Sequence, residues 1–290
     1  MCKKVFRPPD ISNRTEKAVV RAKIMQPATL VIFDYSGTLS LEAADFGRPG
    51  NLERYLKESG LTGAGIVSAD LYWQKVVNPT WPRASTTKAG FKSIATGCIE
   101  KMALSSATSL MIASAVSKFV DEYMRHSRID ERWYPLLSDI QNLPGVIGII
   151  ATDHYAEATG AVRAHLTALD INSVPATGKE TFHGDTVFIV ANSADIGHLK
   201  ASRRFWRKLT RARLSIPVED VILVDDFGSN EPDRFGYSKP EKIKKRIEAT
   251  RKAVGEVFRV EPQIIHFEAG ENPDRAIIET IKVLWKKLKQ

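Results

Sequence analysis

The sequence predicts an α/β fold with a mostly parallel sheet, and three observations support this class. Short apolar runs rich in β-branched residues recur along the chain, and segments with helical periodicity separate most of them. These runs are uninterrupted rather than alternating, as expected for strands that are buried on both faces of a parallel sheet. About a hundred residues without a comparable run follow the first strand, which indicates a helical insertion in the α/β core.

Each element is predicted from its local pattern. The strand runs cover residues 28–33, 146–150, 186–190, 221–224 and 263–267. Helical patterns in the core cover residues 155–169, 201–213 and 274–288, with a smaller helical excursion within 231–260. Helix-length segments in the insertion cover residues 51–59, 68–77, 88–102, 106–126 and 134–142.

The order of these elements divides the chain into three predicted regions. Residues 1–27 are polar and basic and are expected to form an extension. Residues 28–40 and 141–290 would form the α/β core, and residues 41–140 would form a helical cap. An insertion after the first strand would lie over the carboxyl ends of the strands, where α/β folds bind their ligands.

The composition is that of a globular protein. The chain has 290 residues, of which 43% are hydrophobic and 26% are charged. No apolar run approaches the length of a membrane helix and the first residues lack a secretory pattern, so we expect a cytoplasmic protein without a membrane partner. Cys2 and Cys98 cannot form a disulfide framework and lack neighbours at zinc-ligand spacing.

The net charge of +8 favours an anionic ligand. The excess is spread over the N-terminus, residues 200–213 and the final helix. A phosphate-bearing substrate fits this charge as well as nucleic acid does, so the charge alone does not decide between them. The sequence leaves the oligomeric state open, with a homodimer as one option.

Polar residues follow four of the predicted strands. They are Asp34, Thr152-Asp153, Asn192-Ser193 and Asp225-Asp226. Because parallel strands end at one edge of a sheet, these side chains could share one site, where paired carboxylates would call for a hard cation such as Mg²⁺. Each residue taken alone could instead serve in a turn or cap a helix, but the recurrence on successive strands favours a common site.

At these positions the sequence resembles the haloacid dehalogenase superfamily. The segment from Leu30 to Leu39 resembles its first motif, and Ile150 to Asp153 its second. Residues 197–205, around Lys200, are similar to the third motif, and residues 221–231 to the fourth. All four occur in the family order, and the resemblance implies a Rossmann-like core with an inserted cap.

The resemblance also implies roles for individual residues. Asp34 would be the nucleophile that forms an aspartyl-phosphate, Thr152 would hold the phosphoryl group, and Lys200 would neutralise charge. Asp34, Asp226 and, less surely, Asp225 would bind Mg²⁺ together with the backbone carbonyl of Ser36. Thr38 and Asp153 are expected to contact substrate, and Asn230 and Glu231 are left open as further metal ligands.

Ser36 departs from the family pattern. Phosphatases of the superfamily usually have there a second Asp, which protonates the leaving group and later activates water. A serine hydroxyl cannot buffer a proton near neutral pH, and loss of such a group typically costs about 10² to 10⁴ in rate. The resemblance thus implies a Mg²⁺-dependent hydrolase with an altered acid step, which acts on a small phosphorylated or phosphonate substrate rather than on nucleic acid.

A phosphotransferase or a slow phosphatase, in which Ser36 lengthens the life of the aspartyl-phosphate, is one variant of this prediction. Two further alternatives remain. Phosphonatases of the family use a cap lysine to form a Schiff base, and Lys75 lies at a comparable place, where Trp73 and Trp81 could desolvate it. The simpler interpretation is a lysine on the polar face of an amphipathic helix, and Trp81 could equally contact substrate or pack within the cap. The second alternative is a catalytically weak protein that binds a phosphorylated ligand.

Overall fold

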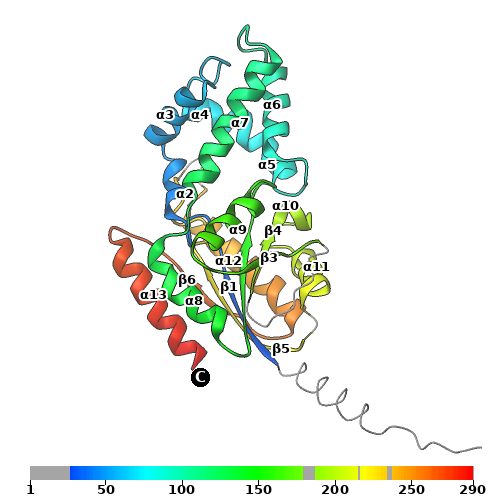
Figure 1. Ribbon diagram of the computed structural model, residues 1–290, viewed down its shortest axis with the longest axis vertical. Coiled ribbons are helices and arrows are strands. Elements are labelled where there is room, and N and C mark those ends of the chain that lie inside the picture. Colours follow the sequence, from blue (N-terminus) through cyan, green and yellow to red (C-terminus); the bar gives the residue numbers. More distant parts are fainter. Residues whose placement is uncertain (1–26, 179–186, 215, 234–236, 290) are drawn as a thin grey trace, which may run out of the picture.

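The computed structural model describes residues 27–178, 187–214, 216–233 and 237–289 (Figure 1). The predicted extension at residues 1–27 therefore lies outside the described residues except for its last one. Within the described part, no helix is long and apolar enough to cross a membrane.

Six parallel strands form one sheet in the order β3-β4-β2-β1-β5-β6, which confirms the predicted α/β class. The strands are β1 (Ala28–Phe33), β2 (Val146–Thr152), β3 (Ser173–Pro175), β4 (Phe188–Asn192), β5 (Val218–Asp225) and β6 (Gln263–His266). The sequence analysis missed β3, which is a three-residue edge strand that ends in proline and carries too short an apolar run to be recognised.

Alternate residues of the central strand β1 face opposite sides of the sheet. Leu30 and Ile32 pack on the side covered by α11 (Arg203–Arg213) and α12 (Pro240–Phe258). Val31 and Phe33 pack on the opposite side, which is covered by α8 (Tyr134–Asn142), α9 (Ala158–Ala168) and α13 (Pro273–Leu288). Burial on both faces explains why the strand reads as an unbroken apolar run.

The insertion between β1 and β2 consists of short and long helices with their own buried cluster. The helices are α2 (Leu41–Phe46), α3 (Pro49–Ser59), α4 (Ala69–Tyr72), the π-helix η1 (Trp73–Val77), α5 (Asn78–Ala84), α6 (Phe91–Met102) and α7 (Ser109–His126). Figure 1 shows these helices at the end of the sheet where β1 leads into α2.

The predicted boundary of the insertion at residue 140 needs correction. The 3₁₀ turn η2 (Glu131–Trp133) and helix α8 pack against the sheet, where Trp133, Leu137 and Ile140 join the cluster around Phe33. The helical periodicity of this segment was recognised, but periodicity identifies an apolar face and not the layer against which that face packs.

The candidate active site

The site is built at the carboxyl edge of the sheet by the residues that follow β1, β2 and β5. Asp34 comes directly after β1, and its backbone N–H donates to the carbonyl of Val224 on β5 at 2.9 Å. Its carboxylate is 7% exposed and accepts a hydrogen bond from Lys200 Nζ. Burial raises the pKa of Asp34 to about 7, because desolvation and the neighbouring Asp225 charge outweigh the opposing effect of Lys200.

Lys200 lies between two carboxylates. Besides Asp34, its Nζ donates to Asp225 Oδ2 at 2.8 Å. Burial lowers the pKa of the Lys200 ammonium, but Asp225, Asp34 and Asp153 together raise it well above its ordinary value, so the ammonium stays charged. Its backbone is fixed as well, because its carbonyl accepts from Trp206 Nε1 at 2.7 Å.

The end of β5 supplies a pair of carboxylates in two different settings. Asp225 Oδ1 accepts from the N–H of Phe227 at 2.7 Å, while its other oxygen holds Lys200. Asp226 Oδ2 accepts from the N–H of Asn230 at 3.0 Å. Burial and the charges of Asp34, Asp225 and Glu231 raise the pKa of Asp226 well above its ordinary value.

The turn after β1 passes very close to Asp226. Gly37 has φ +76°, and a Cβ at this position would stand 2.6 Å from Asp226 Oδ2. Only glycine therefore satisfies both the left-handed backbone and the close approach at this point. The same turn holds Asp226 through Thr38, whose Oγ1 accepts from the Asp226 N–H at 2.9 Å.

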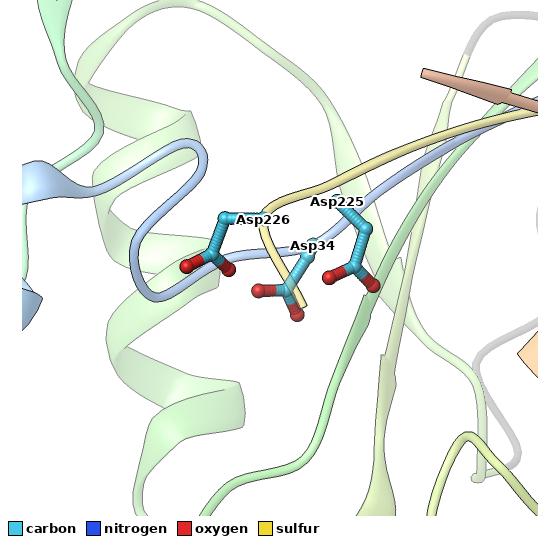
Figure 2. A group of neighbouring side chains, drawn as sticks. All are labelled: Asp34, Asp225 and Asp226. Carbon is cyan, nitrogen blue, oxygen red and sulfur yellow. The ribbon is translucent and has the colours of Figure 1, made fainter. Parts of the chain in front are cut away.

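Asp34, Asp225 and Asp226 form a cluster that suits a divalent cation. Each offers an oxygen within 4.8 Å of the others, and Figure 2 shows the three carboxylates side by side. These are hard oxygen donors, and one ammonium cannot neutralise three carboxylates, so the charge balance fits a cation such as Mg²⁺. Asp225 is held by Lys200 and by the N–H of Phe227, and Asp226 is held by the N–H of Asn230 and, at 3.5 Å, by the hydroxyl of Thr38.

Ser36 and Glu231 face each other beside this cluster. Ser36 Oγ donates to Glu231 Oε1 at 2.7 Å. Burial raises the pKa of Glu231, partly offset by this hydrogen bond. Asn230 connects two loops. Its Nδ2 donates to the carbonyl of Gly37 at 2.7 Å, and its Oδ1 accepts from the N–H of Ala269 at 2.9 Å.

Thr152 and Asp153 continue β2 into the same edge. Thr152 is the last residue of β2, is 1% exposed, and pairs in register with Asn192 of β4. Asp153 Oδ1 accepts from the backbone N–H of Lys200 at 2.8 Å, and burial raises the pKa of Asp153 to about 6. Asp153 thus holds the backbone of the loop that carries Lys200, and its expected contact with substrate stays a prediction.

The remaining predicted substrate contacts lie in other environments. Thr38 is fully buried and engaged with Asp226. Lys75 is exposed on η1, so the desolvated amine that a Schiff-base lysine needs is not formed there. Trp81 packs with the buried cluster of the insertion and meets Tyr155 edge to face at 5.4 Å between ring centroids.

The sequence analysis overlooked one residue that reaches this region from the insertion. Tyr123 on α7 places its hydroxyl 3.0 Å from Nε2 of His154, which follows β2. An aromatic residue within an amphipathic helix is expected in the core, so only the contact of α7 with the loop after β2 reveals the role of its hydroxyl group.

Comparison with known proteins gives only distant structural similarity. No protein-family model and no curated protein matches the sequence. A crystal structure of an L-2-haloacid dehalogenase has a TM-score of 0.49 at 12% identity and covers 90% of this chain and 99% of its own. A 2-haloacid dehalogenase from Pseudomonas syringae pv. tomato has a TM-score of 0.46 at 14% identity, covering 89% and 99%.

Proposed function

We propose that this protein is a Mg²⁺-dependent hydrolase of the haloacid dehalogenase superfamily that acts on a phosphoryl or phosphonyl group of a small molecule. The observation that carries this proposal is the position of Lys200, whose Nζ contacts both Asp34 and Asp225 beside Asp226. An anionic substrate is repelled by a carboxylate nucleophile. The Lys200 ammonium, held beside the Asp34 carboxylate, would offset this repulsion. The order of the four sequence motifs supports the same assignment.

The proposed chemistry assigns a task to each residue of the cluster. Asp34 attacks phosphorus and forms an aspartyl-phosphate, while the bond from phosphorus to the leaving group breaks and that group departs with the electron pair. Water then cleaves the aspartyl-phosphate, which releases inorganic phosphate and regenerates the carboxylate of Asp34. Lys200 offsets the charge on the phosphoryl oxygens. Thr152 donates to the phosphoryl group from the end of β2. Mg²⁺, held by Asp34, Asp226 and the Ser36 carbonyl, would supply charge neutralisation for the dianionic substrate.

We also propose that helices α2–α7 act as the cap of this site. Three polar contacts between the insertion and the core support this role. The Tyr123 hydroxyl meets His154, Ser193 Oγ donates to the carbonyl of Ser85 at 2.6 Å, and Glu157 accepts from the first amides of α6. A helical layer fixed over the strand ends would exclude water from the reaction.

An assay of the purified protein with and without Mg²⁺ tests the proposal. The substrates are phosphomonoesters, acyl phosphates, phosphonoacetaldehyde and 2-haloacids. Metal-dependent phosphate release should occur, and Asp34→Asn should lower it by at least about 10³-fold, because the amide cannot act as the nucleophile. The control Asp139→Asn removes an exposed carboxylate on α8 and should keep the wild-type rate.

The outcomes separate the candidate functions. Full activity of Asp34→Asn would reject the aspartyl-phosphate mechanism. Turnover of 2-haloacids alone, without a need for Mg²⁺, would show that the carboxylate nucleophile attacks carbon and not phosphorus. Binding of Mg²⁺ without turnover of any substrate would favour the catalytically weak binding protein.

A further inference from the structure

Helices α11 and α12 lie side by side on one face of the sheet, where their apolar sides share one buried cluster. Trp206 of α11 meets Phe258 of α12 edge to face at 6.2 Å between ring centroids. Arg203 of α11 forms an ion pair with Glu256 of α12 at 3.4 Å. The solvent-facing sides of the two helices therefore form the outer surface of this layer, which we call the α11–α12 face.

The positive charge of the protein is concentrated in these two helices. They contain twelve Lys and Arg residues and three Glu residues, which gives them a net charge of +9. The whole chain has 42 Lys and Arg and 34 Asp and Glu, so 30 basic and 31 acidic residues lie outside the two helices. The remainder of the chain is thus close to neutral in sum, and the fold brings two basic segments together that are separate in the sequence.

Many of these cations are not neutralised by the protein itself. Helix α11 contains no acidic residue, so none of its cations is paired within the helix. Within the described part of the chain, six exposed side chains of the two helices form no hydrogen bond or ion pair, namely Arg204, Arg207 and Arg211 on α11 and Lys244, Lys245 and Lys252 on α12. The α11–α12 face therefore presents positive charge that is free to meet an anionic partner.

The three unpaired arginines form a row along α11. Positions 204, 207 and 211 are three and four residues apart, so their side chains lie on one side of the helix and span about 10 Å along its axis. A guanidinium group binds phosphate through two parallel hydrogen bonds. A nucleic-acid duplex presents one negative charge per about 1.7 Å of its axis, so such a row can meet several phosphates at once.

The composition of the α11–α12 face favours a nucleic-acid duplex over other polyanions. A helix that binds a membrane surface inserts apolar side chains, but the apolar sides of α11 and α12 are buried against the sheet. Both helices are described over their whole length, and neither exposes a large apolar side chain. Single-stranded nucleic acid is bound through exposed aromatic rings on which its bases stack, and these helices offer none.

We infer that the α11–α12 face binds the phosphate backbone of a nucleic-acid duplex, as a docked partner and not as the substrate of the candidate active site. Because phosphate contacts do not report the base sequence, the binding has no sequence preference. The inference does not depend on the proposed hydrolase activity. The α11–α12 face is the outer surface of a helix layer, whereas the candidate active site lies at the carboxyl edge of the sheet.

The test measures binding of the full-length protein to fluorescently labelled DNA duplexes of about 20 base pairs, in two unrelated sequences, by anisotropy at several salt concentrations. One triple variant removes three charges from the α11–α12 face: Arg204→Gln, Arg207→Gln and Arg211→Gln. A matched control removes three exposed charges from α3, α6 and α13: Lys57→Gln, Lys101→Gln and Lys286→Gln. Both variants change the net charge equally, and urea denaturation verifies that both are folded.

The wild-type protein should bind both duplexes equally, and the logarithm of its association constant should fall linearly with the logarithm of the salt concentration. The variant of the α11–α12 face should bind at least about 10-fold more weakly at about 50 mM salt, and the slope of the salt dependence should decrease by about 2 to 3. The control should keep the wild-type slope, because its charges do not contact the duplex.

Several outcomes would overturn the inference. No binding by the wild-type protein at low salt would reject it directly. Equal weakening in the two variants would assign the binding to the net charge, and undiminished binding by the variant of the α11–α12 face would assign it to another part of the chain. Binding to vesicles of phosphatidylserine and phosphatidylcholine, without binding to the duplexes, would identify the face as a membrane contact. None of these results depends on the hydrolase assay, which contains no nucleic acid.

Discussion

The buried ring of His154 makes the stability of this protein sensitive to acid. Its pKa is lowered to about 4 by burial, against about 6.5 in an unfolded chain. Between these values the unfolded state binds more protons than the folded state, so stability falls as the pH decreases from about 6.5 to 4. The full shift corresponds to about 3 kcal/mol.

His154→Gln should remove this pH dependence. Glutamine can still donate to the Tyr123 hydroxyl but does not titrate. We expect the free energy of unfolding of the wild-type protein to fall relative to that of the variant as the pH decreases, measured by urea denaturation at pH 7.0, 5.5 and 4.5. All other titrating groups are common to both proteins. If the free energies of unfolding of the two proteins changed in parallel with pH, His154 would not be the source of the acid sensitivity.

Gly37 offers a second test at the scale of one residue. Gly37→Ala would introduce both an unfavourable backbone conformation and a contact with Asp226, whereas Gly145→Ala would introduce the backbone conformation alone. Gly145 has φ +75° and open space around its Cβ position. Both variants should lose about 1 to 3 kcal/mol of stability, but only Gly37→Ala should lose Mg²⁺-dependent activity. Equal loss of activity in the two variants would show that Asp226 is not disturbed through this contact.

At the scale of elements, one carboxylate of the core holds the first turn of α6. Glu157 precedes α9 and accepts from the N–H groups of Phe91 at 2.9 Å and Lys92 at 3.0 Å. These amides begin α6 and have no partner within the helix, so an ionised acceptor there is favourable.

Glu157→Ala should lower stability by about 1 to 2 kcal/mol and loosen the first turn of α6. Hydrogen exchange of the amides of Phe91 and Lys92 measures the local effect directly. Glu157→Gln keeps one acceptor oxygen and should lie between the wild type and Glu157→Ala. The control Glu58→Ala, at an exposed site on α3, should leave these amides protected, and equal exchange in all four proteins would reject the attachment.

Local sequence patterns predict where the helices and strands lie better than they predict what each element packs against. The runs that became β1, β2, β4, β5 and β6 are recognisable because central parallel strands must be apolar on both faces. Helix α8 was predicted with its observed bounds, yet it packs on the sheet and not within the insertion. Its sequence specifies an apolar face, and the surface that covers that face depends on the path of the whole chain.

The same limit applies to the site. Asp34, Lys200, Asp225 and Asp226 were predicted together because strand ends and motif order indicate them, and the structure brings them into contact. Thr38 and Asp153 also hold backbone N–H groups of other site residues, a role that no local pattern predicted. Hydrogen bonds between side chains and distant backbone leave no signal in local sequence patterns.

At the scale of the whole molecule, a basic protein encloses a strongly acidic site. The net charge is +8, yet Asp34, Asp225 and Asp226 bring carboxylate oxygens within 4.8 Å of one another, and Lys200 donates to two of them. In the absence of a cation, the raised pKa of Asp34 means that the folded state binds more protons than the unfolded state from about pH 3.8 to 7. The contribution of this group to stability is therefore lost as the pH rises through about 7, opposite to the effect of His154.

Mg²⁺ should restore the stability that is lost when Asp34 ionises, and should thereby stabilise the whole fold. At 100 times its dissociation constant, the ion should add about 2.7 kcal/mol to the free energy of unfolding, which is measurable as a rise in Tm at pH 8. The rise should shrink at pH 5.5, because protons then compete for the carboxylate of Asp34. Asp226→Asn should abolish the response, while Glu271→Gln, an exposed carboxylate on the loop before α13, should retain it. An equal response in Asp226→Asn, or one that is independent of pH, would place the bound ion outside the carboxylate cluster.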